Sequence, residues 1–200
     1  MAKKTSQART PDLKEMFCVA ESYQVAARTL GELTMNPGGK VYAAPYCIIG
    51  AFALEVYLKC LILLEGAEHE DLHDLYKLFS KLKTPSQDKV RALYVPHLKF
   101  GQKMLDHFHQ HAGGSKETAS LELFLERSSK AFIELRYYYE LPLKKGYGWT
   151  GMEISDCVRH VILELKPDWK DALTKFTPRV IPLSAEYPPG TLPTATPRVK

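Results

Sequence analysis

An apolar stretch of 22 residues, from Ala43 to Leu64, constrains this chain more than any other feature. Only Glu55 and Lys59 carry charge in it, and its apolar side chains cover both sides of a helix. Such a helix belongs in a membrane or at the centre of a helical bundle. Because an ionised side chain near mid-membrane costs about 2.5–3.5 kcal/mol, we predict a buried helix, ended by Gly66, and no membrane association.

The chain around this stretch predicts an all-α fold, because no segment alternates as a strand does. We expect an up-and-down helical bundle over residues 11–175, with four long helices plus a short one. After the central helix we expect a short helix over 73–82 and longer ones over 84–111, 116–140 and 153–175. Thr84 is expected to cap its helix. Pro96 and Pro167 should split or kink theirs, since proline removes a backbone donor.

Charge is concentrated at the two ends of the chain. Residues 1–10 carry +3 and residues 176–200 carry +2 of the net +4, so the body carries −1. The net positive charge of the chain therefore does not indicate a nucleic-acid-binding surface. We expect residues 1–10 to be disordered and residues 176–200, rich in proline, to be an extended or disordered tail. The first ten residues lack the apolar core of a secretory signal, so the expected location is cytoplasmic.

Neither the cysteines nor the histidines predict a metal site. The four cysteines are far apart and lie in apolar helical contexts, which predicts buried free thiols. Two histidine pairs, His69/His73 and His107/His111, have the four-residue spacing that can hold zinc on a helix. Neither pair belongs to an H-E-x-x-H motif or has an evident third ligand. We predict no metal and no cofactor.

Three groups of residues are candidates for binding. Glu55 and Lys59, four residues apart, share one line of the helix surface. They either line a groove between helices or form a bridge where the helix reaches the surface, worth about 0.2–0.5 kcal/mol. Arg136 extends a largely apolar helical column and has Tyr139 and two further tyrosines beside it. It can bind phosphate and stack on bases, or pair internally with a glutamate.

A third candidate is the loop containing Lys144 and Lys145. These lysines lie close to Tyr147 and Trp149 and form a small basic and aromatic patch. Such a patch can contact RNA, and it can equally be an interhelical loop anchored by Trp149.

Three segments resemble the HEPN domain: AFALEVYLKCLILLEG at 51–66, HDLYKLFSKL at 73–82 and AFIELRYYYE at 131–140. The resemblance implies a small all-α bundle that usually dimerises. Active HEPN domains are metal-independent RNases in which an Arg is followed four to six residues later by His. Arg136 matches that Arg, but the next histidine is His160. Because the proton-transfer partner is missing, the resemblance implies the scaffold more firmly than an RNase.

These observations predict a non-catalytic HEPN-like module that binds RNA, a nucleotide or a protein partner. The resemblance implies a homodimer in a bacterial-type defence or toxin–antitoxin context, with a nucleotidyltransferase-like protein as a candidate partner. The alternative is a divergent metal-independent endoribonuclease that uses Arg136 with Glu55, Lys59 or a tyrosine.

Overall fold

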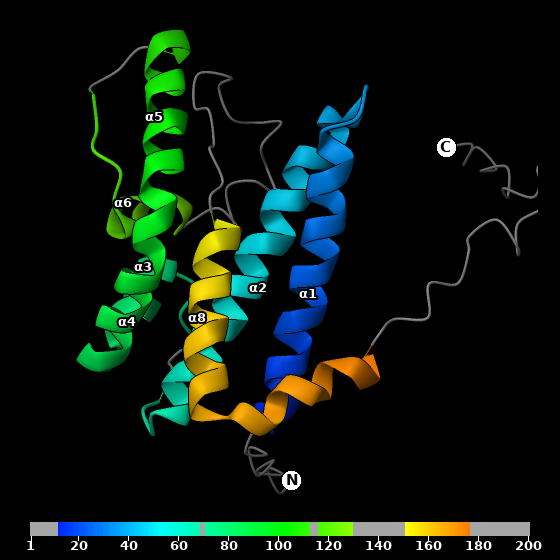
Figure 1. Ribbon diagram of the computed structural model, residues 1–200, viewed down its shortest axis with the longest axis vertical. Helices are drawn as coiled ribbons and strands as arrows, with labels where there is room; N and C mark the ends of the chain where they lie inside the picture. Colours follow the sequence, from blue (N-terminus) through cyan, green and yellow to red (C-terminus); the bar gives the residue numbers. More distant parts are fainter. Residues whose placement is uncertain (1–11, 69–70, 113–115, 130–150, 177–200) are drawn as a thin grey trace, which may run out of the picture.

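The computed structural model describes residues 12–68, 71–112, 116–129 and 151–176, and in these residues the chain forms helices joined by turns and irregular segments, without a strand (Figure 1). The all-α prediction is confirmed for this part of the chain. The α-helices are α1 (Leu13–Thr34), α2 (Ala43–Leu64), α3 (Leu75–Lys81), α4 (Thr84–Tyr94), α5 (Leu98–Ala112), α6 (Leu121–Ser128) and α8 (Gly151–Leu165). Short 3₁₀ segments are η1 (Gly39–Tyr42), η2 (Val95–His97) and η4 (Pro167–Phe176). The predicted ends, residues 1–10 and most of the tail, lie outside the described residues.

The two longest helices, α1 and α2, form an antiparallel pair. Asp12 caps α1, because its Oδ1 accepts hydrogen bonds from the backbone N–H groups of Lys14 and Glu15. At the end of α2, Gly66 has φ of +76° and its N–H bonds to the Leu63 carbonyl, while the Ala67 N–H bonds to the Ile62 carbonyl. This Schellman arrangement ends α2 where the sequence predicted.

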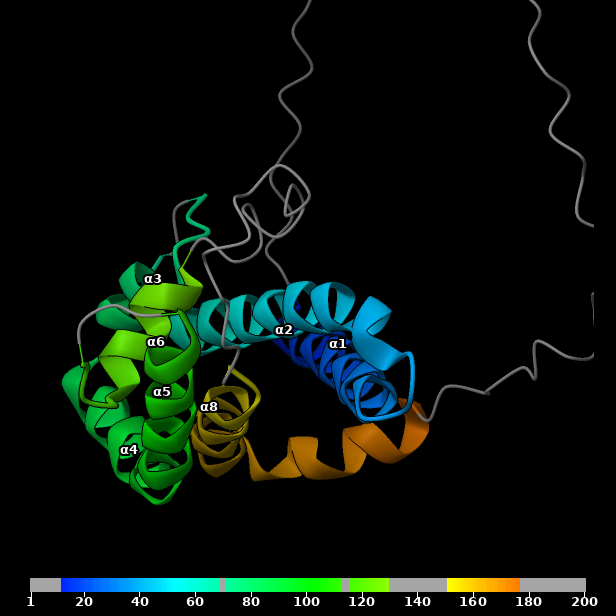
Figure 2. The same ribbon diagram turned by 90° about the horizontal axis from the view of Figure 1, so that it is seen from above.

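Helix α2 is the central element, as predicted. Figure 2 shows α1 and α8 on the same side of it, both below α2 in that view. Leu54, Leu58, Leu61 and Ile62, which lie on different sides of α2, are all 0% exposed. By length and composition, α2 is the one helix in the described residues that could cross a membrane, yet 61% of its most apolar window is buried inside the protein. That burial is typical of a core helix.

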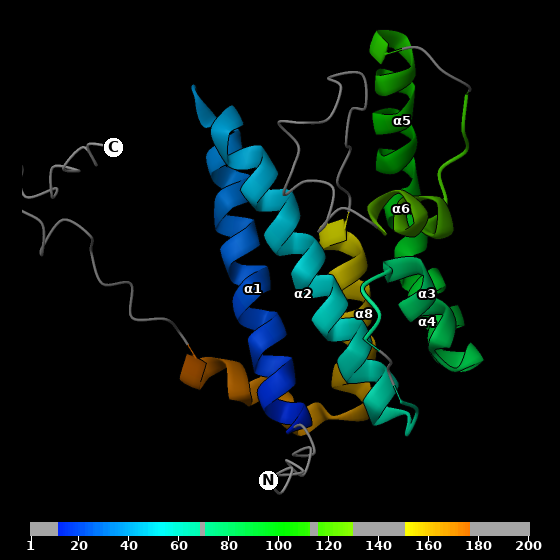
Figure 3. The same cartoon turned by 180° about the vertical axis from the view of Figure 1, so that it is seen from behind.

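The segment from α3 to α6 forms a second group of helices beside α8 (Figures 1 and 3). Pro96 lies in η2 and separates α4 from α5, which confirms the predicted split. Thr84 is the first residue of α4 rather than its cap; Lys83 precedes the helix with an extended backbone and makes no side-chain cap bond. The Gln87 amide instead donates to the Leu82 carbonyl at 2.7 Å.

The expected helix over 116–140 begins later than predicted. Ser120 caps α6 by accepting the Leu123 N–H, and residues 116–120 are not helical. Gln102 of α5 explains why: its amide donates to the Glu117 carbonyl and accepts the Ala119 N–H. These bonds occupy backbone groups that a longer helix would need. Residues 130–140 of the predicted helix lie outside the described residues.

The last helical segment is broken where Pro167 predicts. Helix α8 ends at Leu165, and η4 then runs across the end of α1 at which that helix begins (orange in Figure 3). Trp169 of η4 packs on Phe17 of α1 with ring centroids 5.4 Å apart. This contact fixes the path of the chain after α8 and closes that end of the core.

Candidate functional site

The structure places two of the six candidate binding residues. Glu55 and Lys59 lie on α2. The other four, Arg136, Tyr139, Lys144 and Lys145, fall within 130–150, outside the described residues. A site within the described residues therefore has to be identified from their contacts, burial and charge.

Glu55 and Lys59 form a largely buried ion pair rather than a bridge at the surface. The Glu55 side chain is 4% exposed and that of Lys59 12% exposed, and Lys59 Nζ donates to Glu55 Oε1 at 2.8 Å. A carboxylate withdrawn from water in this way needs close partners. The alternative of a salt bridge where the helix reaches the surface is therefore wrong.

A histidine distant in sequence completes this cluster. His73, in the irregular segment just before α3, has its Nδ1 2.9 Å from the same Glu55 oxygen. When the imidazole is neutral and donates from Nδ1, its Nε2 is left as a hydrogen-bond acceptor. The His73 side chain is 53% exposed, so the imidazole is backed by a buried carboxylate and still meets solvent.

A second buried polar network, which the sequence did not predict, joins α1, α2 and α8. The Tyr57 hydroxyl lies 2.7 Å from Glu21 Oε1 and 2.6 Å from Gln24 Oε1, and Arg159 Nε donates to the same Glu21 oxygen. Burial, followed by the charge of Glu21, raises the pKa of Tyr57, so the hydroxyl stays protonated. The hydroxyl has one proton for these two oxygens, while Arg159 also donates to Glu21 and the Gln24 amide donates to Asp156 at 2.6 Å, which is the pattern of a structural network.

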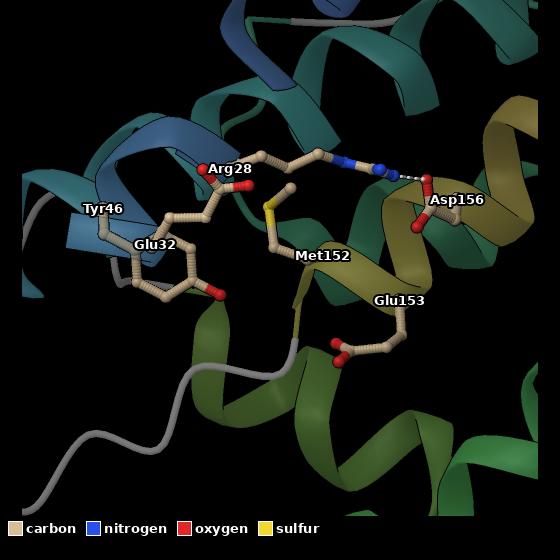
Figure 4. A pocket seen from close by; sticks show the side chains of 7 residues that line it. Arg28, Glu32, Tyr46, Met152, Glu153 and Asp156 are labelled. Carbon is tan, nitrogen blue, oxygen red and sulfur yellow. Dashed lines mark hydrogen bonds and ion pairs between the residues drawn. The ribbon is translucent and has the colours of Figure 1, made fainter. Parts of the chain in front are cut away.

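A pocket of about 350 Å³ opens beside the first residues of α8 (Figure 4). Its lining is Arg28, Gly31, Glu32, Tyr46, Met152, Glu153 and Asp156. Arg28 is occupied by an ion pair with Asp156, which Figure 4 shows as a dashed line. Burial raises the pKa of Glu153, and burial together with the Glu153 charge raises the pKa of Tyr46 to about 12. Three carboxyl groups against one paired arginine do not suit a phosphate ligand.

The segment from α3 to α5, residues 73–112, is basic, and we call it the basic arm. It holds seven lysines and arginines against three aspartates, whereas residues 12–68 hold four basic and seven acidic residues. Some of the charge is used internally: Arg91 pairs with Asp88 and Glu122, and Lys89 pairs with Glu164 of α8. Five of its lysines are exposed to solvent: the paired Lys89, together with Lys77, Lys83, Lys99 and Lys103.

The basic arm does not show in the charge of the two ends set against that of the whole body. A net charge of −1 over the body concealed a positive segment between negative ones. Counting charge over each predicted helix would have revealed it.

Comparisons of this chain with protein-family models, curated proteins and solved structures found no match.

Proposed function

We propose that this protein is a non-catalytic, HEPN-like helical module that binds RNA through the basic arm. The observation that carries the proposal is the concentration of exposed lysines on α3–α5 beside an acidic group of helices. The resemblance of residues 51–66, 73–82 and 131–140 to HEPN domains supports it.

The physical argument is electrostatic. A polyanion gains affinity wherever cationic side chains replace its condensed counterions, and this gain falls as salt rises. The acidic residues of α1 and α8 repel a polyanion from that side of the protein, so they favour its binding on the side of the basic arm. An RNA strand is thus attracted to the basic arm and repelled from the acidic pocket beside the first residues of α8.

The test is a charge reversal on the basic arm with a matched control. In fluorescence anisotropy with a labelled RNA, Lys83→Glu/Lys103→Glu should weaken binding at least tenfold. If both lysines contact phosphates, it should also reduce the slope of log K against log[salt] by roughly 1.4, at about 0.7 per single-strand phosphate. The control, Lys14→Glu/Lys170→Glu, makes the same change in net charge at exposed positions on α1 and η4. Equal losses in both variants would contradict a binding face on the basic arm.

The proposal also predicts that RNA remains intact. Without the histidine that follows the Arg in active HEPN domains, the proton-transfer step lacks its usual group. Purified protein incubated with total RNA in EDTA should leave the RNA length distribution unchanged over hours.

The endoribonuclease remains the second candidate, because the structure places His73 against Glu55. A buried carboxylate that orients a solvent-facing imidazole is an arrangement suited to general acid–base chemistry. RNA cleavage by the wild type that is lost in both His73→Gln and Arg136→Ala, in a nuclease-free preparation, would favour this candidate over the binding module. Retention of the wild-type melting temperature in both variants would show that the loss is chemical.

A further inference from the structure

We infer that the outer face of α5 is a stacking platform for single-stranded RNA, with Phe100 as the ring on which a base stacks and Lys99 and Lys103 as phosphate contacts. This inference rests on the proposed function, because it names the form of RNA and the residues that would distinguish it.

The packing of α5 fixes which of its faces is outward. Gly101 is buried against α6, so closely that an added Cβ would lie 2.7 Å from the Phe124 ring. Leu105, one turn further along the same face, is 6% exposed. Residues on the opposite face must therefore point away from α6 and the core.

Phe100, Lys103 and His107 occupy that opposite face, at i, i+3 and i+7 of the helix. Lys99 lies one turn before Lys103 on its flank. From residue 99 to residue 107 the face extends about 12 Å at 1.5 Å per residue. Phe100 is 56% exposed, and both lysines are exposed. One acidic residue of α5, Asp106, is turned toward Gln102, whose amide donates to its carboxylate at 3.0 Å.

This combination favours a nucleic-acid strand over another protein. An apolar protein surface docked on Phe100 would also cover the charged groups of Lys99 and Lys103, and withdrawing them from water without a partner is costly. A single strand offers complementary groups, since its bases stack on an aromatic ring while its phosphates meet the cations. Bases in an RNA duplex are already stacked and paired, so they cannot use the ring.

The experiment compares a labelled oligouridine strand with a labelled RNA duplex of equal length, by fluorescence anisotropy. Phe100→Ala should weaken single-strand binding about tenfold and change duplex binding less than twofold. Phe100→Leu keeps an apolar side chain without a π face and should resemble Phe100→Ala, whereas Phe100→Tyr should bind as the wild type does. Val95→Ala removes another exposed apolar side chain, 59% exposed in the adjoining η2, and should change neither affinity.

The possible failures can be told apart. If the wild type binds neither RNA, the proposed function fails and the inference fails with it. If Lys83→Glu/Lys103→Glu weakens binding but Phe100→Ala does not, the basic arm stands and the stacking platform is overturned. Equal losses on strand and duplex, or a Phe100→Ala variant that changes only the particle mass in light scattering, would also overturn it. The last result would identify this face as a contact between copies of the chain.

Discussion

At the scale of single residues, the buried charge of Glu55 sets the sharpest expectation. Lys59→Ala leaves this carboxylate with one fewer compensating partner and should lower the free energy of unfolding by about 3–5 kcal/mol. Glu55→Gln/Lys59→Met removes both charges and should recover most of that loss. Urea unfolding measures all three proteins, with exposed Lys170→Ala as a control that should stay within about 0.5 kcal/mol of the wild type. A Lys59→Ala variant with unchanged stability would contradict a buried pair.

The cysteines give a second expectation at this scale. All four are free and buried, as predicted. Burial raises the pKa of Cys47 and Cys157 to about 11 and that of Cys60 to about 12, and it also raises the pKa of Cys18. Because the thiolate is the reactive form, iodoacetamide at pH 8 should add slowly to the native protein and rapidly to all four thiols in guanidinium. Intact-mass measurements follow both reactions, and rapid native labelling would be inconsistent with this burial.

The sequence predicted the spacing of these polar residues but not their environment. The four-residue spacing predicts that Glu55 and Lys59 lie side by side on the helix, and their ion pair confirms this. A helix that is apolar on every side has no outward face, so its periodicity could not show that the pair is buried. The partner His73 lies 18 residues away, and Glu21 lies 36 residues from Tyr57. Only the packing of helices brings such groups together.

At the scale of helices, the contact between Gly101 and Phe124 should hold α5 on α6. Gly101→Ala would place a methyl group 2.7 Å from a ring that is itself 3% exposed. Overpacking of this kind costs about 1–3 kcal/mol, from which the better helix propensity of alanine recovers up to about 1. We expect a net loss of stability in thermal unfolding. Gly101→Ala/Phe124→Leu should regain part of it, and a stabilised Gly101→Ala variant would show that the two helices are not in close contact.

Helix ends were predicted correctly where one strong local signal decides them. Gly66, Pro96 and Pro167 each change the backbone geometry or its hydrogen bonds at their own position. The start of α6 was wrong because two signals compete there. The hydrophobic pattern permitted a helix from Lys116, whereas Ser120 and the distant Gln102 bind the backbone of residues 117–123 in another form. A bond from a residue far along the chain cannot be read from a local pattern.

At the scale of the whole molecule, the expected assembly is a homodimer. The HEPN resemblance implies it, and exposed apolar side chains in the turn between α1 and α2 are consistent with a partner: Met35 is 87% exposed, Val41 72% and Tyr42 38%. Multi-angle light scattering should give a particle of roughly 45 kDa, since one chain is 22.7 kDa. A 22.7 kDa particle at high micromolar concentration would contradict the dimer.

The position of the contact can be tested in the same measurement. Val41→Lys places a charge among these apolar side chains, and desolvating it on association should shift the particle toward monomer at low micromolar concentration. Val25→Lys makes the same change on the exposed side of α1, where Val25 is 49% exposed, and should leave the mass unchanged. If only Val25→Lys dissociates the particle, the outer side of α1 is the interface and the turn is free. In either case the basic arm lies on different helices, so neither substitution alters the face that we propose to bind RNA.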